Sequence, residues 1–188
     1  MDQLLDLAVM LRPHADDAER ELVARLAGRL GFIAVHVPMS EDMRMDPESL
    51  ERLSRAADPA MVVLDDGATN VGIVRRNDPE LVKRARSDLD QLEDARPLIV
   101  AVPISIGRTF NEATARADRE PRFIGDDDPR VSGIFGTFEQ AQQQVLALAR
   151  AGAEVLLLTV PHEQDVADVL AQVRALVVGA TPALLEGQ

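Results

Sequence analysis

The sequence predicts an α/β fold in which parallel strands alternate with helices. Short apolar runs that end in proline or glycine recur along the chain, and amphipathic stretches with helical spacing lie between them. Several of these stretches begin with a capping residue followed by proline or glutamate. This alternation is typical of a parallel sheet covered by helices. We count five clear strands, one doubtful strand and about six helices in the 188 residues.

The length of the chain bears on the architecture of this sheet. A closed eight-stranded barrel needs at least about 200 residues and usually about 250. The chain is shorter, so we predict a reduced or incomplete TIM-like (β/α) barrel with parallel strands. The alternative is an open doubly wound parallel sheet, which the same alternation allows. Residues 1–188 are expected to form a single domain, because this length suffices to bury one core.

The first strand–helix–strand unit shows how the elements are delimited. Residues 4–11 and 32–37 are apolar and are predicted to be strands. The helix between them begins at Asp16 and Asp17, whose charges suit a helix N-terminus, and ends at Gly31. Two parallel strands joined by one helix form a right-handed βαβ unit.

The middle of the chain contains two Asp-Pro-Glu sequences, at 46–48 and 78–80, that mark helix starts. In each, the aspartate caps the helix and the proline occupies its first position. The helices are expected to end near Ala57 and Leu92. The strands expected in this part are residues 61–64, the doubtful 72–74, and 98–106.

The C-terminal part contains two capping boxes. They start at Thr109 and at Thr137, each with glutamate or glutamine three residues later. A strand is predicted at 155–160 and a final helix at about 163–177. Residues 119–135 are expected to form an irregular surface loop, and residues 179–188 a frayed tail.

The composition excludes several functional classes. The chain has no cysteine, so disulfides and thiolate metal sites are excluded, and no histidine–glutamate cluster has zinc spacing. A formal charge of −12, no tryptophan and no tyrosine disfavour nucleic acid. No apolar run is long enough to span a bilayer and no secretory signal is visible, so we expect a cytoplasmic protein that does not bind membranes.

Three motifs occur in an order that matches a known family. They are the run 30–38 (Leu-Gly-Phe-Ile-Ala-Val-His-Val-Pro), Gly107-Arg108-Thr109, and 136–140 (Gly-Thr-Phe-Glu-Gln) followed by Ala-Gly and an apolar strand. In order and spacing the chain resembles the luciferase-like flavin-dependent monooxygenases. The matching parts correspond to the first two and the last three units of that family's barrel.

The resemblance implies a function. Luciferase-like proteins are oxidoreductases that bind FMN or a deazaflavin coenzyme at the C-terminal face of the strands, act on small molecules, and often form homodimers. Such enzymes pass a hydride from the reduced coenzyme or let it meet oxygen. By resemblance, the chain is expected to bind FMN or a deazaflavin and no metal, and to form a homodimer.

Two histidines are candidate proton donors. His36 lies inside the second predicted strand, on the face opposite Ile33, Val35 and Val37. If those three residues face the helices, His36 points into the barrel; otherwise it is hydrogen-bonded within the sheet or exposed at an open edge. His162 follows the last predicted strand, where ligands bind in such folds, although an exposed loop histidine fits the same position.

Candidate cofactor-binding residues also follow the predicted strands. They are Met39, Arg75, Arg76, Ser105 and Arg108. A guanidinium binds phosphate or carboxylate through two hydrogen bonds, which suits the arginines for an anionic ligand. Ion pairs with the numerous surface carboxylates are the alternative.

A second hypothesis is non-catalytic. An incomplete barrel exposes unpaired strand edges, which proteins must cover or pair. A degenerate barrel that pairs with a second copy across such an edge would serve as a homodimeric scaffold or partner subunit.

Overall fold

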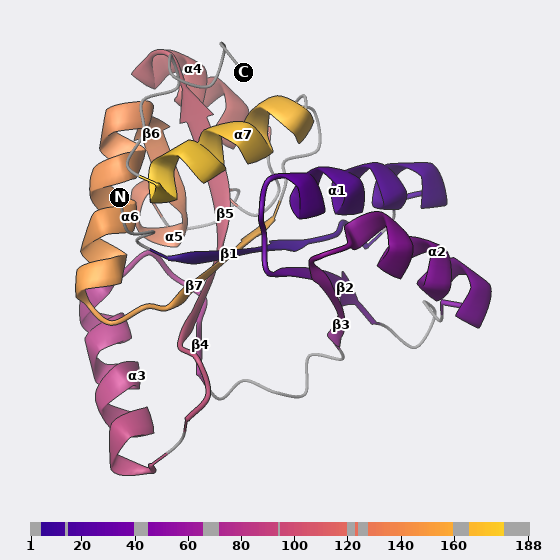
Figure 1. The fold of residues 1–188 in the computed structure, drawn as a ribbon. Coiled ribbons are helices and arrows are strands. Elements are labelled where there is room, and N and C mark those ends of the chain that lie inside the picture. Colours follow the sequence, from indigo (N-terminus) through magenta and orange to yellow (C-terminus); the bar gives the residue numbers. More distant parts are fainter. Residues whose placement is uncertain are drawn as a thin grey trace.

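The computed structural model describes residues 5–13, 15–39, 45–65, 72–93, 95–119, 123, 128–159 and 166–178. Parallel strands form a single sheet with helices packed against it (Figure 1). The strands are β1 Asp6–Met10, β2 Ala34–Pro38, β3 Met61–Asp65, β4 Ile73–Val74, β5 Ile99–Gly107, β6 Ile134–Thr137 and β7 Val155–Thr159. The helices are α1 Asp17–Arg29, α2 Pro47–Ala57, α3 Pro79–Gln91, α4 Phe110–Ala117, α5 Pro129–Ser132, α6 Phe138–Arg150 and α7 Val166–Val177.

The strand order is that of an incomplete barrel. It reads β3-β2-β1-β7-β5-β4, and β6 pairs with the second half of β5. The first and last strands are neighbours and pair in parallel along their whole length, as they do in a closed barrel. Among the described residues β3 ends the sheet on one side and β4 and β6, both paired with β5, end it on the other, and β3 pairs with neither of them. The predicted α/β fold with a reduced barrel is therefore confirmed.

The helices cover one face of the sheet, which we call the outer face. In β1, Leu7 and Val9 belong to the main core, which also contains Val23 of α1 and Leu170 of α7. Ala8 and Met10 alternate with them and belong to a separate, smaller cluster on the opposite or inner face. A doubly wound sheet would carry helices on both faces along its length, so this alternative does not describe the chain.

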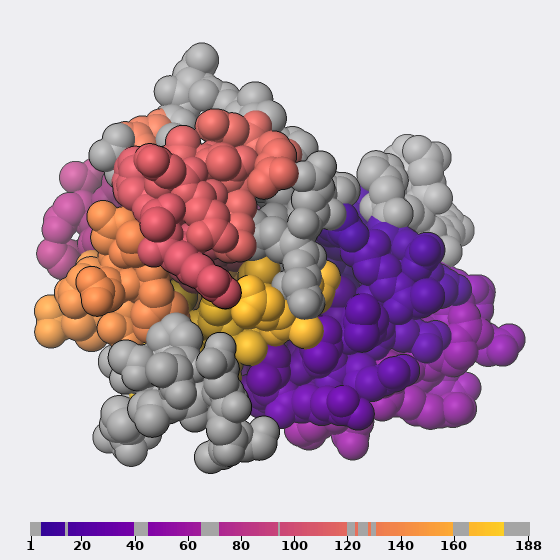
Figure 2. All heavy atoms as spheres, turned by 90° about the horizontal axis from the view of Figure 1, so that it is seen from above, coloured from indigo at the N-terminus to yellow at the C-terminus, as the bar shows by residue number. Residues whose placement is uncertain are grey.

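Helix α7 joins the two halves of the molecule. It lies between α6 and α1, which the view from above shows (Figure 2). Leu170 and Leu176 of α7 are fully buried there. Among the described elements the last helix is thus packed against the first one, and the first and last strands lie side by side.

Helix α4 is the exception to the one-sided arrangement. Ala113 and Ala117 of α4 pack against Phe123 and Phe135, on the inner face at the end of β5 and β6. Ile134 points the other way and belongs to the main core. At this corner the sheet is covered on both faces.

Most predicted elements lie within two residues of their observed bounds, and α2 is Pro47–Ala57 as expected. The expected loop 119–135 differs, because it contains α5 and the start of β6. The capping box at Thr137 is complete. At Thr109 the reciprocal bond differs: the Glu112 carboxylate accepts from the backbone N–H of Arg108 instead of Thr109. The predicted tail lies outside the described residues.

Candidate functional site

The inner face is built in layers because neighbouring parallel strands are in register. One layer consists of Ala34, Ala8, Leu157 and Ala101 on β2, β1, β7 and β5. The next layer, nearer the C-terminal ends of the strands, consists of His36, Met10, Thr159 and Pro103. Interiors of TIM barrels are usually filled by bulky branched residues. Three of the four residues in the first layer are alanines, of which Ala8 and Ala34 are buried and Ala101 is partly exposed.

Exposure varies across the inner face. Ala8 and Leu157, in the central strands, are buried. Toward the two ends of the sheet, Val63 and Ala101 are only partly buried and Met61 is 65% exposed. The inner face is therefore most accessible at His36, Met61 and Val63 on one flank and at Ala101 on the other, whereas Ala34 of β2 is buried.

His36 occupies the more accessible half of the upper layer. It is in register with Met10 on β1 and with Val63 on β3, and it is half-buried. Val35 and Val37, its neighbours in sequence, belong to the main core on the outer face. The expected alternation in β2 is confirmed, so the side chain of His36 lies on the inner face.

Two of the candidate cofactor ligands contribute to packing. Ser105 is 1% exposed, and its hydroxyl donates to Ala113 O of α4 at 2.8 Å. Met39 is half-buried against the main core. The structure therefore places both side chains within the fold, and a role in ligand binding stays a prediction.

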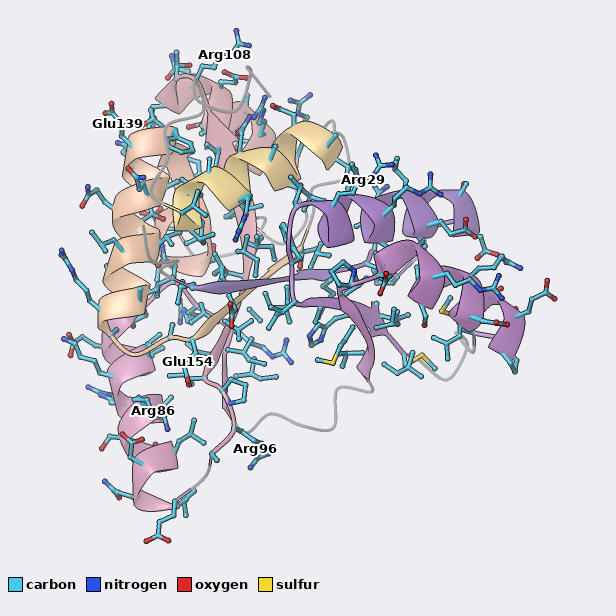
Figure 3. All side chains as sticks on the ribbon, viewed as in Figure 1. Arg29, Arg86, Arg96, Arg108, Glu139 and Glu154 are labelled. Carbon is cyan, nitrogen blue, oxygen red and sulfur yellow. The ribbon has the colours of Figure 1, made fainter. Side chains whose placement is uncertain are left out.

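The candidate arginines lie at the C-terminal ends of β4 and β5. Arg75 and Arg108 are exposed and Arg76 is half-buried. Arg108 stands beside α4, at the end of the sheet opposite the Arg86–Glu154 ion pair, whose atoms are 2.9 Å apart (Figure 3). Strands lie about 4.8 Å apart, so β5, three strands along from β2, is about 14 Å from it along the sheet. The structure does not bring the arginines to His36.

A polar network fixes the segment that carries Arg75 and Arg76. The next residue, Asn77, donates from Nδ2 to Gly133 O at 2.9 Å and to Gln144 Oε1 at 2.7 Å. Its backbone N–H donates to Val131 O. Asn77 thus ties the end of β4 to the start of β6. In the sequence it reads as an ordinary loop residue, so its role carried no local signal.

The predicted site residue His162 lies outside the described residues. Among the residues that are described, no group of three or more histidines, aspartates and glutamates could hold a metal ion. None of the described helices is long and apolar enough to cross a membrane.

Comparison with known proteins places the fold. Neither a protein-family model nor a curated protein matches the sequence. A solved structure does match: the coenzyme F420-dependent tetrahydromethanopterin reductase from Methanopyrus kandleri, with a TM-score of 0.69 and 9% sequence identity. The match covers 93% of this chain and 99% of that chain. The chain has the fold of a luciferase-like protein. The resemblance seen in the sequence is thereby confirmed for the fold.

Proposed function

We propose that the chain is an oxidoreductase that binds a 5-deazaflavin coenzyme, or alternatively FMN, on the inner face of the sheet. The observation that carries this proposal is the inner face along β2, β3 and β5, where His36, Val63 and Ala101 are partly exposed. In barrel folds ligands bind at the C-terminal ends of the strands, and His36, the central residue of β2, lies in the layer nearer to those ends. The F420 dependence of the structural neighbour favours the deazaflavin over FMN.

The residues present fit the ring system of such a coenzyme. Ligand sites are mostly apolar, with a few polar groups that fix orientation. Small and aliphatic side chains line the inner face, and His36 and Thr159 are the polar groups of its upper layer. An anionic tail would meet the exposed guanidinium of Arg75 or Arg108.

When bound, a flavin or deazaflavin supplies hydride transfer. The chain itself supplies orientation, exclusion of water and proton handling. Met10, Thr159 and Pro103 are buried and keep water from the central part of the upper layer. His36 is half-buried, and an imidazole can hold or release a proton near neutral pH. We assign it the role of proton donor to the substrate.

Fluorescence titration tests the proposal. The wild type is expected to bind a 5-deazaflavin coenzyme or FMN saturably at micromolar concentration. Ala101→Leu fills the alanine layer and is expected to weaken binding at least tenfold. Ala95→Leu makes the same change at an exposed position and serves as the matched control. No binding of either coenzyme up to about 1 mM, or about −4 kcal/mol, would contradict the proposal.

The open sheet also supports the second function. Among the described residues β3 and β4 leave the barrel unclosed, as expected of a scaffold that a partner completes. A dimeric protein that binds neither coenzyme would favour this non-catalytic function. Dimerisation alone does not discriminate, because an oxidoreductase can also be a dimer.

A further inference from the structure

We propose that β3 is the pairing edge for a second copy of this chain, joined antiparallel about a two-fold axis so that the two sheets become continuous. This inference does not depend on coenzyme binding. It rests on the backbone of β3, on the side chains around it and on the absence of charge within residues 60–64.

The backbone of β3 is paired on one side within the described residues. Its only partner there is β2, and Met61 N donates to Ile33 O at 2.9 Å. Because alternate residues of a strand direct their N–H and C=O groups to opposite sides, Val62 and Leu64 direct theirs away from β2. These groups form the unpaired edge.

The side chains at this edge are apolar. Met61 is 65% exposed, Leu64 is 46% exposed, and Ile33 beside them is 38% exposed. Edge strands of monomeric proteins are usually protected by charges, proline, a bulge or shortness. The opposite edge consists of β4, which is two residues long, and β6, where the backbone groups of Phe135 are bonded to Gln144. By contrast, β3 has five residues and carries no charge from Met61 to Leu64. The edge of β3 therefore favours a partner strand.

A second copy fits this edge better than a charged partner. A two-fold axis perpendicular to the sheet allows three registers of β3: Val62 opposite the partner's Val62, Val62 opposite the partner's Leu64, or Leu64 opposite the partner's Leu64. Asp65 then lies opposite the partner's Pro59, Met61 or Val63, respectively. Within β3 no register sets two acidic residues opposite each other, despite the net charge of −12. A charged peptide would find no opposite charge on the strand.

Pairing would also extend the candidate site. Val63 is in register with His36 and lies on the same inner face. The partner's β3 would continue this face directly beyond Val63. Two inner faces would then form one surface with a histidine on each side of the axis.

Cysteine cross-linking tests the registers, because the native chain has no cysteine. In the first register two copies of residue 62 face each other with Cα atoms about 5.5 Å apart, and in the third two copies of residue 64 do so; in the second, two copies of residue 63 lie about 4.5 Å apart. Both distances suit a disulfide. We expect one of Val62→Cys, Val63→Cys and Leu64→Cys to form a covalent dimer under mild oxidation. Leu92→Cys, 71% exposed on the turn after α3, is the control for random collision. Cross-linking of none of the three edge variants above the level of Leu92→Cys would overturn the proposal.

Proline substitution tests the edge itself. The N–H of Val62 points away from β2, so Val62→Pro removes no bond within the sheet. The wild type and Val62→Thr are expected to sediment as dimers at about 100 µM. Val62→Pro is expected to sediment as a monomer with an unchanged circular dichroism spectrum. If Val62→Pro does not fold, Leu64→Lys replaces it as the variant expected to be monomeric. A monomeric wild type, or a folded edge variant that remains dimeric, would overturn the proposal.

Discussion

The side-chain amide of Gln144 is hydrogen-bonded to both backbone groups of Phe135. Its Oε1 accepts from Phe135 N at 3.1 Å, and its Nε2 donates to Phe135 O at 2.6 Å. Within the described residues β6 pairs with β5 alone, so this amide satisfies the backbone of β6 where another strand would do so. Asn77 donates to the same Oε1 at 2.7 Å. One helix side chain therefore connects β4, β6 and α6.

Gln144→Ala is expected to lower the free energy of unfolding by about 2 kcal/mol, because it leaves buried backbone groups of Phe135 without a partner. Gln143→Ala, at the exposed neighbouring position on α6, is the control and is expected to have little effect. Urea denaturation measures both. Equal stability of the two variants would show that the amide does not support β6.

Gly28→Ala is expected to destabilise the protein by about 1–3 kcal/mol, the usual cost of overpacking. A Cβ at this position of α1 would overlap Ala57 O and lie 2.8 Å from Asp58 O. Helix propensity alone predicts the opposite sign, a gain of about 1 kcal/mol. Thermal unfolding of Gly28→Ala shows whether the variant is destabilised by overpacking or stabilised by helix propensity. Arg25→Ala, at an exposed site of α1, is the control. A stabilised Gly28→Ala would contradict the close approach of α1 and α2.

The carboxylate of Asp46 makes the stability of α2 depend on pH. This carboxylate accepts from Ser49 N at 2.9 Å and from Ser49 Oγ at 2.8 Å, and these bonds lower the pKa of Asp46 below 3.8. Its contribution is therefore complete above about pH 4 and is lost as the pH falls through the lowered pKa. Asp46→Asn keeps a capping side chain without this titration. Urea denaturation at pH 7 and pH 2.5 measures the free energy of unfolding of both proteins. Asp46→Asn should lose less of this free energy between pH 7 and pH 2.5 than the wild type does. An equal loss in both proteins would refute the pH-dependent contribution of Asp46.

Ser105→Ala is expected to cost about 1 kcal/mol of stability, since it removes the hydrogen bond to Ala113 O. If the hydroxyl serves only to hold α4, the affinity for the coenzyme should stay unchanged. Calorimetric titration of the variant measures this affinity. A tenfold loss of affinity without further loss of stability would instead support the cofactor-binding role predicted from the sequence.

The fold was largely predictable because its signals are local. Asp46 and Pro47 mark the start of α2 unambiguously, and alternation within β2 placed His36 on the face opposite Val35. Strand β6 was missed because it is four residues long, follows Gly133, contains Gly136 and depends on pairing with β5. Its short apolar run is too brief to show a period of its own.

The candidate site was less predictable because it depends on contacts between distant residues. The alanine layer exists only once Ala8, Ala34 and Ala101 are brought into register by three different strands. Asn77 and Gln144 are 67 residues apart, and neither carries a motif. Ser105 was predicted to contact a ligand because it lies near the C-terminal end of β5, but α4 covers this end of the strand.

Nuclear Overhauser effects in methyl-labelled protein would test the central claim, that the inner face is the coenzyme site, most directly. We expect contacts from the aromatic protons of a bound 5-deazaflavin to the methyl groups of Val63 and Ala101, which are partly exposed on the inner face. Contacts confined to outer-face methyl groups such as those of Val35 and Val100, or no contacts at saturating coenzyme, would contradict it.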